Sequence, residues 1–198
     1  MLIVLNTHKC FDDIAIYLIS LVSLALTGEI YVTGKASKYG LDHVASMDGK
    51  AIGKRLTFYP STVLDPFYKQ KWPSQLRFDV KPVTIPANQN LPLGVFEKPL
   101  YAIGQSMFIN YFERYRPTIG NTYGAKKPYK WPAEWNFARV VRNAISHNGM
   151  INFESQSSKP VSWKGLVYDP KDNGKRIIFT DLWMADLIYL MLEMDSYL

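Results

Sequence analysis

Apolar residues recur at intervals of three and four positions in the segment that begins at Pro99. The recurring residues are Leu100, Ile103, Met107, Phe108, Tyr111, Phe112 and Tyr115. This period places them on one face of an α-helix. Pro99 suits a first helical position, and Pro117 interrupts the pattern. The pattern therefore predicts a helix over residues 99–116 whose apolar face lies in the core.

A second stripe of the same period predicts a helix between Pro132 and Gly149. Its apolar residues are Trp135, Ala138, Val141 and Ile145. Gly149 is the expected stop, because glycine is common just after the end of a helix. Two further helices are predicted over residues 7–26 and 181–198. The first is apolar around nearly the whole helix circumference, which indicates a central helix, and the second is strongly apolar with Asp181 as its expected N-cap.

The segment between the first two predicted helices has no lasting period. Prolines interrupt residues 34–93 at six positions: Pro60, Pro66, Pro73, Pro82, Pro86 and Pro92. Within it, RLTFYP and QLRFDV have the composition of short strands. Because an irregular loop of this length is unusual in a compact domain, we interpret residues 34–93 as an irregular, proline-rich insertion.

Before the last predicted helix, PVSWKGLVY and GKRIIFT flank DPKDN, whose composition is typical of a turn. Residues 161–180 are therefore predicted to form a β-hairpin. Four helices, one hairpin and an irregular insertion together predict a mainly α fold. We expect a four-helix bundle that forms a single domain over residues 1–198.

The chain is basic. It carries 23 Lys and Arg against 17 Asp and Glu, a net charge of +6 with a pI near 9.2. This balance favours a polyanionic partner, either nucleic acid or an acidic membrane.

Cys10 is the only cysteine, which excludes an internal disulfide and a cysteine-rich zinc site. His8, Cys10, Asp12 and Asp13 spread around a helix axis, so neither a metal site nor a cofactor is predicted. The apolar run from Ile14 to Leu26 is shorter than the roughly 20 residues that span a bilayer. Asp12 and Asp13 stand where a signal peptide carries positive charge. We expect a core helix in a cytoplasmic protein without a membrane partner, and a secretory signal is the alternative.

The stretch RVVRNAISHNGM, residues 139–150, places Arg142, Asn143 and His147 on the last turns of the helix that stops at Gly149. This motif resembles the HEPN superfamily, whose signature is an arginine, often followed by a polar residue such as asparagine, and then a histidine four to six residues later. The resemblance is confined to the motif and the general helical plan. It implies a metal-independent ribonuclease that acts as a dimer, in many members as a toxin with an antitoxin partner or in defence against phage. Other members bind without catalysis.

The residue types suit RNA cleavage without a metal ion. Such cleavage needs a group that takes the 2′-hydroxyl proton and a fixed cation that stabilises the phosphorane. We predict that His147 transfers the proton, that Arg142 binds the phosphate through its planar fork, and that Asn143 positions either of them. Arg139, one turn earlier, either extends the RNA-binding site or solvates the helix. The alternative for the motif is structural, with His147 capping its helix and Arg142 paired with a surface carboxylate.

Val140 and Ala144 lie on the side of this helix that carries Asn143 and His147, opposite the core stripe. A second, half-apolar face needs a second contact, which is either another helix of the same chain or a second chain. We expect a homodimer with His147 at or near the interface.

Three lysines alternate with three aromatic residues in the loop before this helix. They are Lys126, Lys127 and Lys130, with Tyr123, Tyr129 and Trp131. Alternating charge and aromatic rings are typical of proteins that bind single-stranded nucleic acid, so the lysines are predicted RNA contacts. The alternative is a solvated loop with Trp131 in the core.

Overall fold

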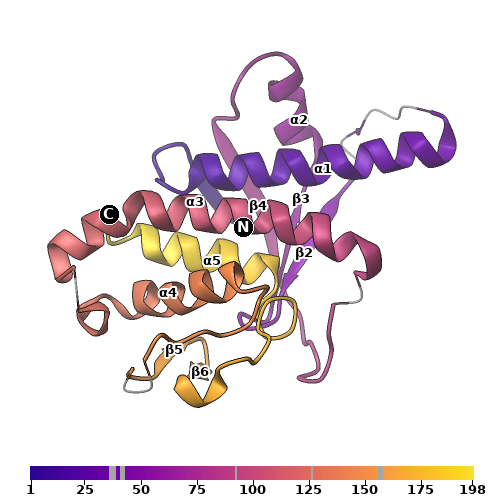
Figure 1. Cartoon of the computed structure of the whole chain (residues 1–198). Helices are drawn as coiled ribbons and strands as arrows, with labels where there is room; N and C mark the ends of the chain where they lie inside the picture. The colour runs from indigo at the N-terminus through magenta and orange to yellow at the C-terminus, as the bar shows by residue number, and fades with distance from the viewer. Residues whose placement is uncertain (36–38, 41–42, 92, 126, 156–157) are drawn as a thin grey trace.

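The computed structural model describes residues 1–198 except 36–38, 41–42, 92, 126 and 156–157. Its longer helices are α1 (Phe11–Thr33), α3 (Glu97–Tyr123), α4 (Ala133–Ser146) and α5 (Met184–Asp195). In Figure 1, α1 lies along α3, and α5 lies between α3 and α4. A shorter helix, α2 (Ser61–Tyr68), packs on α1.

A four-stranded antiparallel sheet packs against these helices. It consists of β1 (Leu2–Leu5), β2 (Ala45–Gly49), β3 (Lys54–Phe58) and β4 (Gln75–Pro82), in the order β1-β4-β3-β2. The fold is therefore mixed α and β, and the prediction of a mainly α four-helix bundle is wrong. Residues 34–93 are not an irregular insertion, because they supply α2 and every strand of this sheet except β1.

The sheet forms because its strands alternate between buried and exposed residues. Leu56 and Phe58 in β3 are buried, whereas Arg55 before them is exposed and Thr57 between them is partly exposed. Phe78 in β4 is buried next to the exposed Arg77. Because the alternation repeats every two residues, one face of the sheet packs against α5 and the other face lies in solvent.

A buried carboxylate joins the sheet to the start of α5. The Asp186 side chain is completely buried and accepts hydrogen bonds from the backbone N–H groups of Trp183 at 2.7 Å, Lys50 at 2.8 Å and Ile52 at 3.0 Å. The turn after β2 approaches it closely, since a Cβ added at Gly49 would lie 2.7 Å from Asp186 Oδ1. Asp186 therefore fixes the β2–β3 turn against the helix N-terminus.

The hairpin before the last helix is shorter than predicted. Its strands are β5 (Val161–Trp163) and β6 (Leu166–Tyr168), and its turn has positive φ at Lys164 (47°) and Gly165 (82°). The sequence 169–173, predicted as the turn, instead forms a 3₁₀ turn over Pro170–Asp172. The second predicted strand, GKRIIFT, makes only isolated bridges, such as Met150 with Arg176.

Helix α1 is longer than the predicted apolar run and has two different halves. Its residues Phe11–Ile30 have a mean hydropathy of 1.7 and, by length and composition, meet the criterion for a membrane span. The first half contributes Ile14 and Leu18 to the core. The last turns extend beyond the helices in Figure 1 and expose Val32 to 81%. The first half of α1 is buried like a core helix, as predicted. The last turns of α1 are exposed and do not belong to the core.

Candidate functional site

Helix α4 carries the Arg142, Asn143 and His147 motif and is anchored through its predicted apolar stripe. Trp135, Ala138, Val141 and Ile145 are all buried, which confirms the stripe. The Trp135 indole packs on Phe112 of α3 and donates from Nε1 to Met194 O of α5 at 2.9 Å. The position of α4 against α3 and α5 is therefore fixed by its core face.

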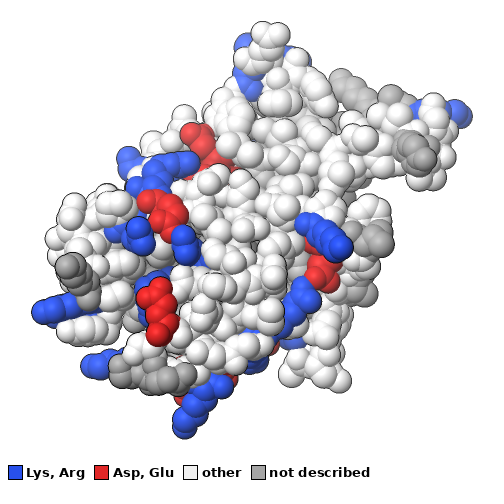
Figure 2. Space-filling model, viewed as in Figure 1, with Lys and Arg blue, Asp and Glu red and all other residues white. Residues whose placement is uncertain are grey.

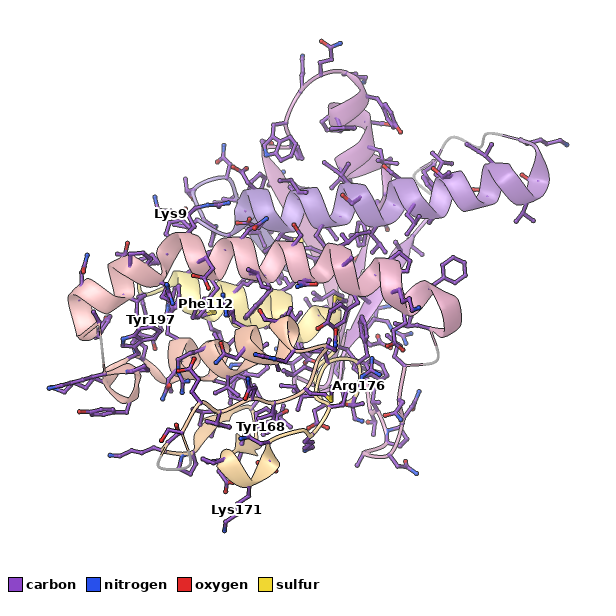
Figure 3. All side chains as sticks on the ribbon, viewed as in Figure 1. Lys9, Phe112, Tyr168, Lys171, Arg176 and Tyr197 are labelled. Atoms are coloured by element: carbon purple, nitrogen blue, oxygen red, sulfur yellow. The ribbon has the colours of Figure 1, made fainter. Side chains whose placement is uncertain are left out.

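The opposite face of α4 is covered by the same chain. Val140 is 1% exposed and Ala144 is fully buried. Helix α4 packs there on the β5–β6 hairpin, and Phe137 stacks on Tyr168 with ring centroids 5.5 Å apart. Figure 3 shows Tyr168 on the hairpin below α4 and Phe112 on α3 above it. Val140 and Ala144 are therefore not a dimer surface, and the argument for a homodimer from these two residues is wrong.

Arg142 faces α3 rather than open solvent. Its Nε lies 2.6 Å from Glu113 Oε1, and each side chain is 32% exposed. Neither atom makes a well-directed hydrogen bond, so the contact is an ion pair. The Arg142 Nη1 donates a long hydrogen bond of 3.4 Å to Asn143 Oδ1. The predicted alternative, a carboxylate partner for Arg142, is thus present.

Arg142 and Asn143 line an open hollow of about 540 Å³ between α3 and α4. Arg116 of α3 and Arg139 of α4 line the same hollow, together with Trp131 and Glu154. Figure 2 shows basic and acidic side chains interleaved over this side of the molecule. The structure therefore gathers three guanidinium groups around one cavity.

Arg139 is the least neutralised of these arginines. Burial lowers its pKa, and the nearby Glu154 opposes this effect. Its Nε and Nη2 donate to Asn136 Oδ1 at 3.3 and 3.2 Å, and it has no ion pair within the part of the chain that the structure describes. A half-buried cation with a single amide acceptor is suited to bind an anion.

His147 lies outside this hollow. It caps the C-terminus of α4, is exposed, and its Nε2 lies 2.8 Å from Asn152 Nδ2. Helix α4 ends at Ser146, one residue earlier than a stop at Gly149 predicts. It ends there because Asn148 adopts the left-handed conformation (φ 56°) and the Gly149 N–H donates to Ala144 O. The motif is therefore divided between the hollow and the helix end.

Two of the three predicted lysine contacts lie near the hollow, next to its lining residues Pro128 and Trp131. Lys127 and Lys130 are exposed, and Lys126 lies outside the described residues. Trp131 is only 8% exposed and donates from Nε1 to Gly124 O, so it is a core residue and not a stacking platform. Tyr129 is 54% exposed and lies 5.2 Å from the Lys159 ammonium.

Sequence reasoning missed Arg116 and Glu113 although both lie within the predicted helix 99–116, because a helical period does not show which polar residues face a second helix. In the structure α3 continues past Pro117 to Tyr123, and its later residues Gly120 and Asn121 also line the hollow. A proline removes one helical hydrogen bond but does not always end a helix. Glu154 and Asn152 follow α4 in a loop that has no periodic signal.

Among the described residues, no group of three or more His, Cys, Asp or Glu is arranged to hold a metal ion. Comparison of the chain with protein-family models, curated proteins and solved structures finds no match. The relationship to the HEPN superfamily therefore stays a hypothesis that rests on the motif.

Proposed function

We propose that the protein binds RNA at the arginine hollow and cleaves it as a metal-independent endoribonuclease of HEPN type. The observation that carries the proposal is the convergence of Arg116, Arg139 and Arg142 with Asn143 on one open cavity. Guanidinium groups bind phosphate through paired, charge-assisted hydrogen bonds. A cavity with three of them suits a polyanion better than a neutral ligand.

Glu113, which pairs with Arg142 and Arg116, and Glu154, which lines the hollow, offset part of the charge of the three guanidinium groups. Because the Arg142–Glu113 contact lacks hydrogen-bond geometry, a phosphate that accepts two bonds from the guanidinium is a stronger partner for Arg142. We infer that RNA exchanges with Glu113 at this arginine. Glu113→Gln is accordingly expected to strengthen RNA binding.

His147 is the proposed proton-transfer group. Its Nε2 lies 2.8 Å from Asn152 Nδ2, and because an amide nitrogen only donates, Nε2 is the acceptor in this contact. An imidazole nitrogen that accepts a hydrogen bond can take the proton in attack by the 2′-hydroxyl. A homodimer, an antitoxin partner, a role in phage defence and a cytoplasmic location belong to the same proposal, and they rest on the HEPN resemblance alone.

A second candidate is a HEPN-like module that binds RNA without cleaving it. It is favoured by the position of His147 outside the hollow and by the ion pair that Arg142 makes with Glu113. The two candidates share the RNA-binding hollow and differ only in whether His147 acts on the bound strand.

Binding is tested by replacing Arg139 with alanine. Loss of a charge-assisted phosphate contact is expected to weaken RNA binding roughly tenfold to a hundredfold. The slope of log affinity against log salt concentration should fall by the amount expected for about one phosphate contact. Fluorescence anisotropy with labelled RNA at several salt concentrations measures both. Arg55→Ala is the matched control, because Arg55 is paired with Asp48 on the sheet. Equal affinity of the Arg139 variant and wild type contradicts the proposed site.

The lysines before α4 have a smaller expected effect. Replacing Lys126, Lys127 and Lys130 together with alanine should weaken RNA binding and flatten its salt dependence, because phosphate contacts release counterions. The same anisotropy titration measures this change. An unaltered salt slope would assign these lysines to solvation.

A further inference from the structure

A second group of aromatic and basic residues is exposed at the end of α2. In the described part of the chain, seven aromatic residues are at least 36% exposed. Four of them lie in the short segment 59–72: Tyr59, Phe67, Tyr68 and Trp72. Aromatic rings stabilise a protein mainly when they are buried. Their concentration on the surface therefore indicates a binding role.

The segment FYKQKW, residues 67–72, alternates rings and amines in a defined turn. Phe67 and Tyr68 are 42% and 65% exposed, with their ring centroids 5.6 Å apart. Gln70 adopts the left-handed conformation (φ 56°), and the Lys71 N–H bonds to Pro66 O at 2.9 Å. Trp72 is 45% exposed, and its Nε1 donates to Asp12 Oδ1 at 2.8 Å. The rings are thus held in place without being covered.

The segment stands between two hollows. Tyr68 and Lys69 line one of about 320 Å³ together with Tyr39. Gln75 and Arg77 line the other, of about 340 Å³. An extended ligand can therefore contact the rings and still reach a hollow on either side.

Basic residues outnumber acidic ones around these rings, although Asp12 accepts a hydrogen bond from the Trp72 indole. Lys69, Lys71 and Arg77 are exposed, and within the described residues neither lysine makes an ion pair. Asp65 is the one acidic residue that lines either hollow. At the top of Figure 2, where α2 lies in Figure 1, basic side chains appear without an acidic one beside them.

We propose that this aromatic–basic patch, Phe67 to Trp72 with Arg77, binds single-stranded nucleic acid. Bases stack on exposed rings, and lysine and arginine neutralise the backbone phosphates. A membrane surface is the competing ligand, but it requires a continuous apolar face, and here the exposed Lys69, Lys71 and Arg77 lie among and beside the rings. The patch shares no lining residue with the arginine hollow and is independent of the proposed catalytic activity.

The test uses a fluorescein-labelled oligouridine of about 12 nucleotides, within the usual site size for single strands. Binding is measured by anisotropy for full-length Phe67→Ala/Tyr68→Ala and Lys69→Ala/Lys71→Ala proteins, each with and without Arg139→Ala/Arg142→Ala. Phe96→Ala, which removes a 63% exposed ring on another helix, is the matched control. Circular dichroism checks that each exposed-site variant remains folded.

Loss of the two rings should weaken binding about tenfold or more without changing the salt slope, because stacking releases no counterions. Loss of the two lysines should reduce the salt slope. If the ring variant loses binding and the arginine variant does not, the patch is supported and the arginine hollow is not. Full affinity of the ring variant in the arginine-deficient background overturns the proposal. It is also overturned if no oligonucleotide binds and the rings are needed instead for binding phosphatidylserine vesicles.

Discussion

Replacing His147 with alanine is expected to slow RNA cleavage by roughly 10²–10⁴-fold while leaving the protein folded. The loss follows from removing the group that takes the 2′-hydroxyl proton. The fold should tolerate the change because His147 is exposed at the end of α4 and its side chain contacts only Asn152 among the described residues. RNA binding should change little, since the guanidinium groups of the hollow remain.

The measurement is cleavage of a pool of structured and single-stranded RNAs by purified protein in the presence of EDTA. Activity that survives EDTA and leaves 2′,3′-cyclic or 3′-phosphate ends supports attack by the 2′-oxygen. Ser146→Ala is the control, because Ser146 is the exposed neighbour of His147. Equal rates for wild type and His147→Ala, or a requirement for magnesium, would exclude the mechanism. Intact RNA with retained binding would favour the module that binds without cleaving.

Arg142→Ala separates the two candidates in another way. If Arg142 stabilises the phosphorane, its loss should reduce the cleavage rate more than the affinity, because a transition-state contact contributes little to ground-state binding. A loss confined to affinity would make Arg142 a binding residue only. Single-turnover rates at saturating protein, compared with anisotropy titrations, distinguish these results.

The four longer helices were predictable because each carries a long apolar segment, whereas the short helix α2 was missed. The stripe from Trp135 to Ile145 identified the core face of α4, since fourteen residues give the period of 3.6 enough repeats. The sheet was not recognised, because its strands are four to eight residues long and lie among prolines. β1 also pairs with β4, so Leu2 faces Phe78 across a large sequence separation that no local pattern records.

The candidate site was predictable only in part for a related reason. A helical period shows that Val140 and Ala144 share a side of α4, but not that the β5–β6 hairpin covers that side. It also could not show that Arg116 comes from another helix to join Arg142. Residue type suggests a chemistry for the site, whereas tertiary packing determines which groups lie together.

Replacing Asp186 with alanine is expected to lower the free energy of unfolding by at least about 2 kcal/mol at neutral pH. The change leaves the backbone N–H groups of Trp183, Lys50 and Ile52 without their acceptor. It also releases the β2–β3 turn from the start of α5. Urea denaturation followed by circular dichroism measures the loss of unfolding free energy. The control is Asp195→Ala, which removes a carboxylate near the other end of α5 that accepts hydrogen bonds from fewer donors. An unfolding free energy equal to that of wild type would contradict this structural role.

The same carboxylate should make stability depend on pH. Burial raises the pKa of Asp186 from 3.8 to about 6 in the folded protein, although the N–H donors oppose this shift. The folded protein therefore binds this proton more tightly than the unfolded chain, so the associated stability is fully present below pH 3.8 and is lost as pH rises through about 6. Relative to Asp186→Asn, which cannot titrate, wild type should gain roughly 2 kcal/mol between neutral pH and pH 4. Urea titrations at several pH values measure this difference. Parallel pH profiles for the two proteins would show that Asp186 keeps an ordinary pKa, with its N–H donors outweighing burial.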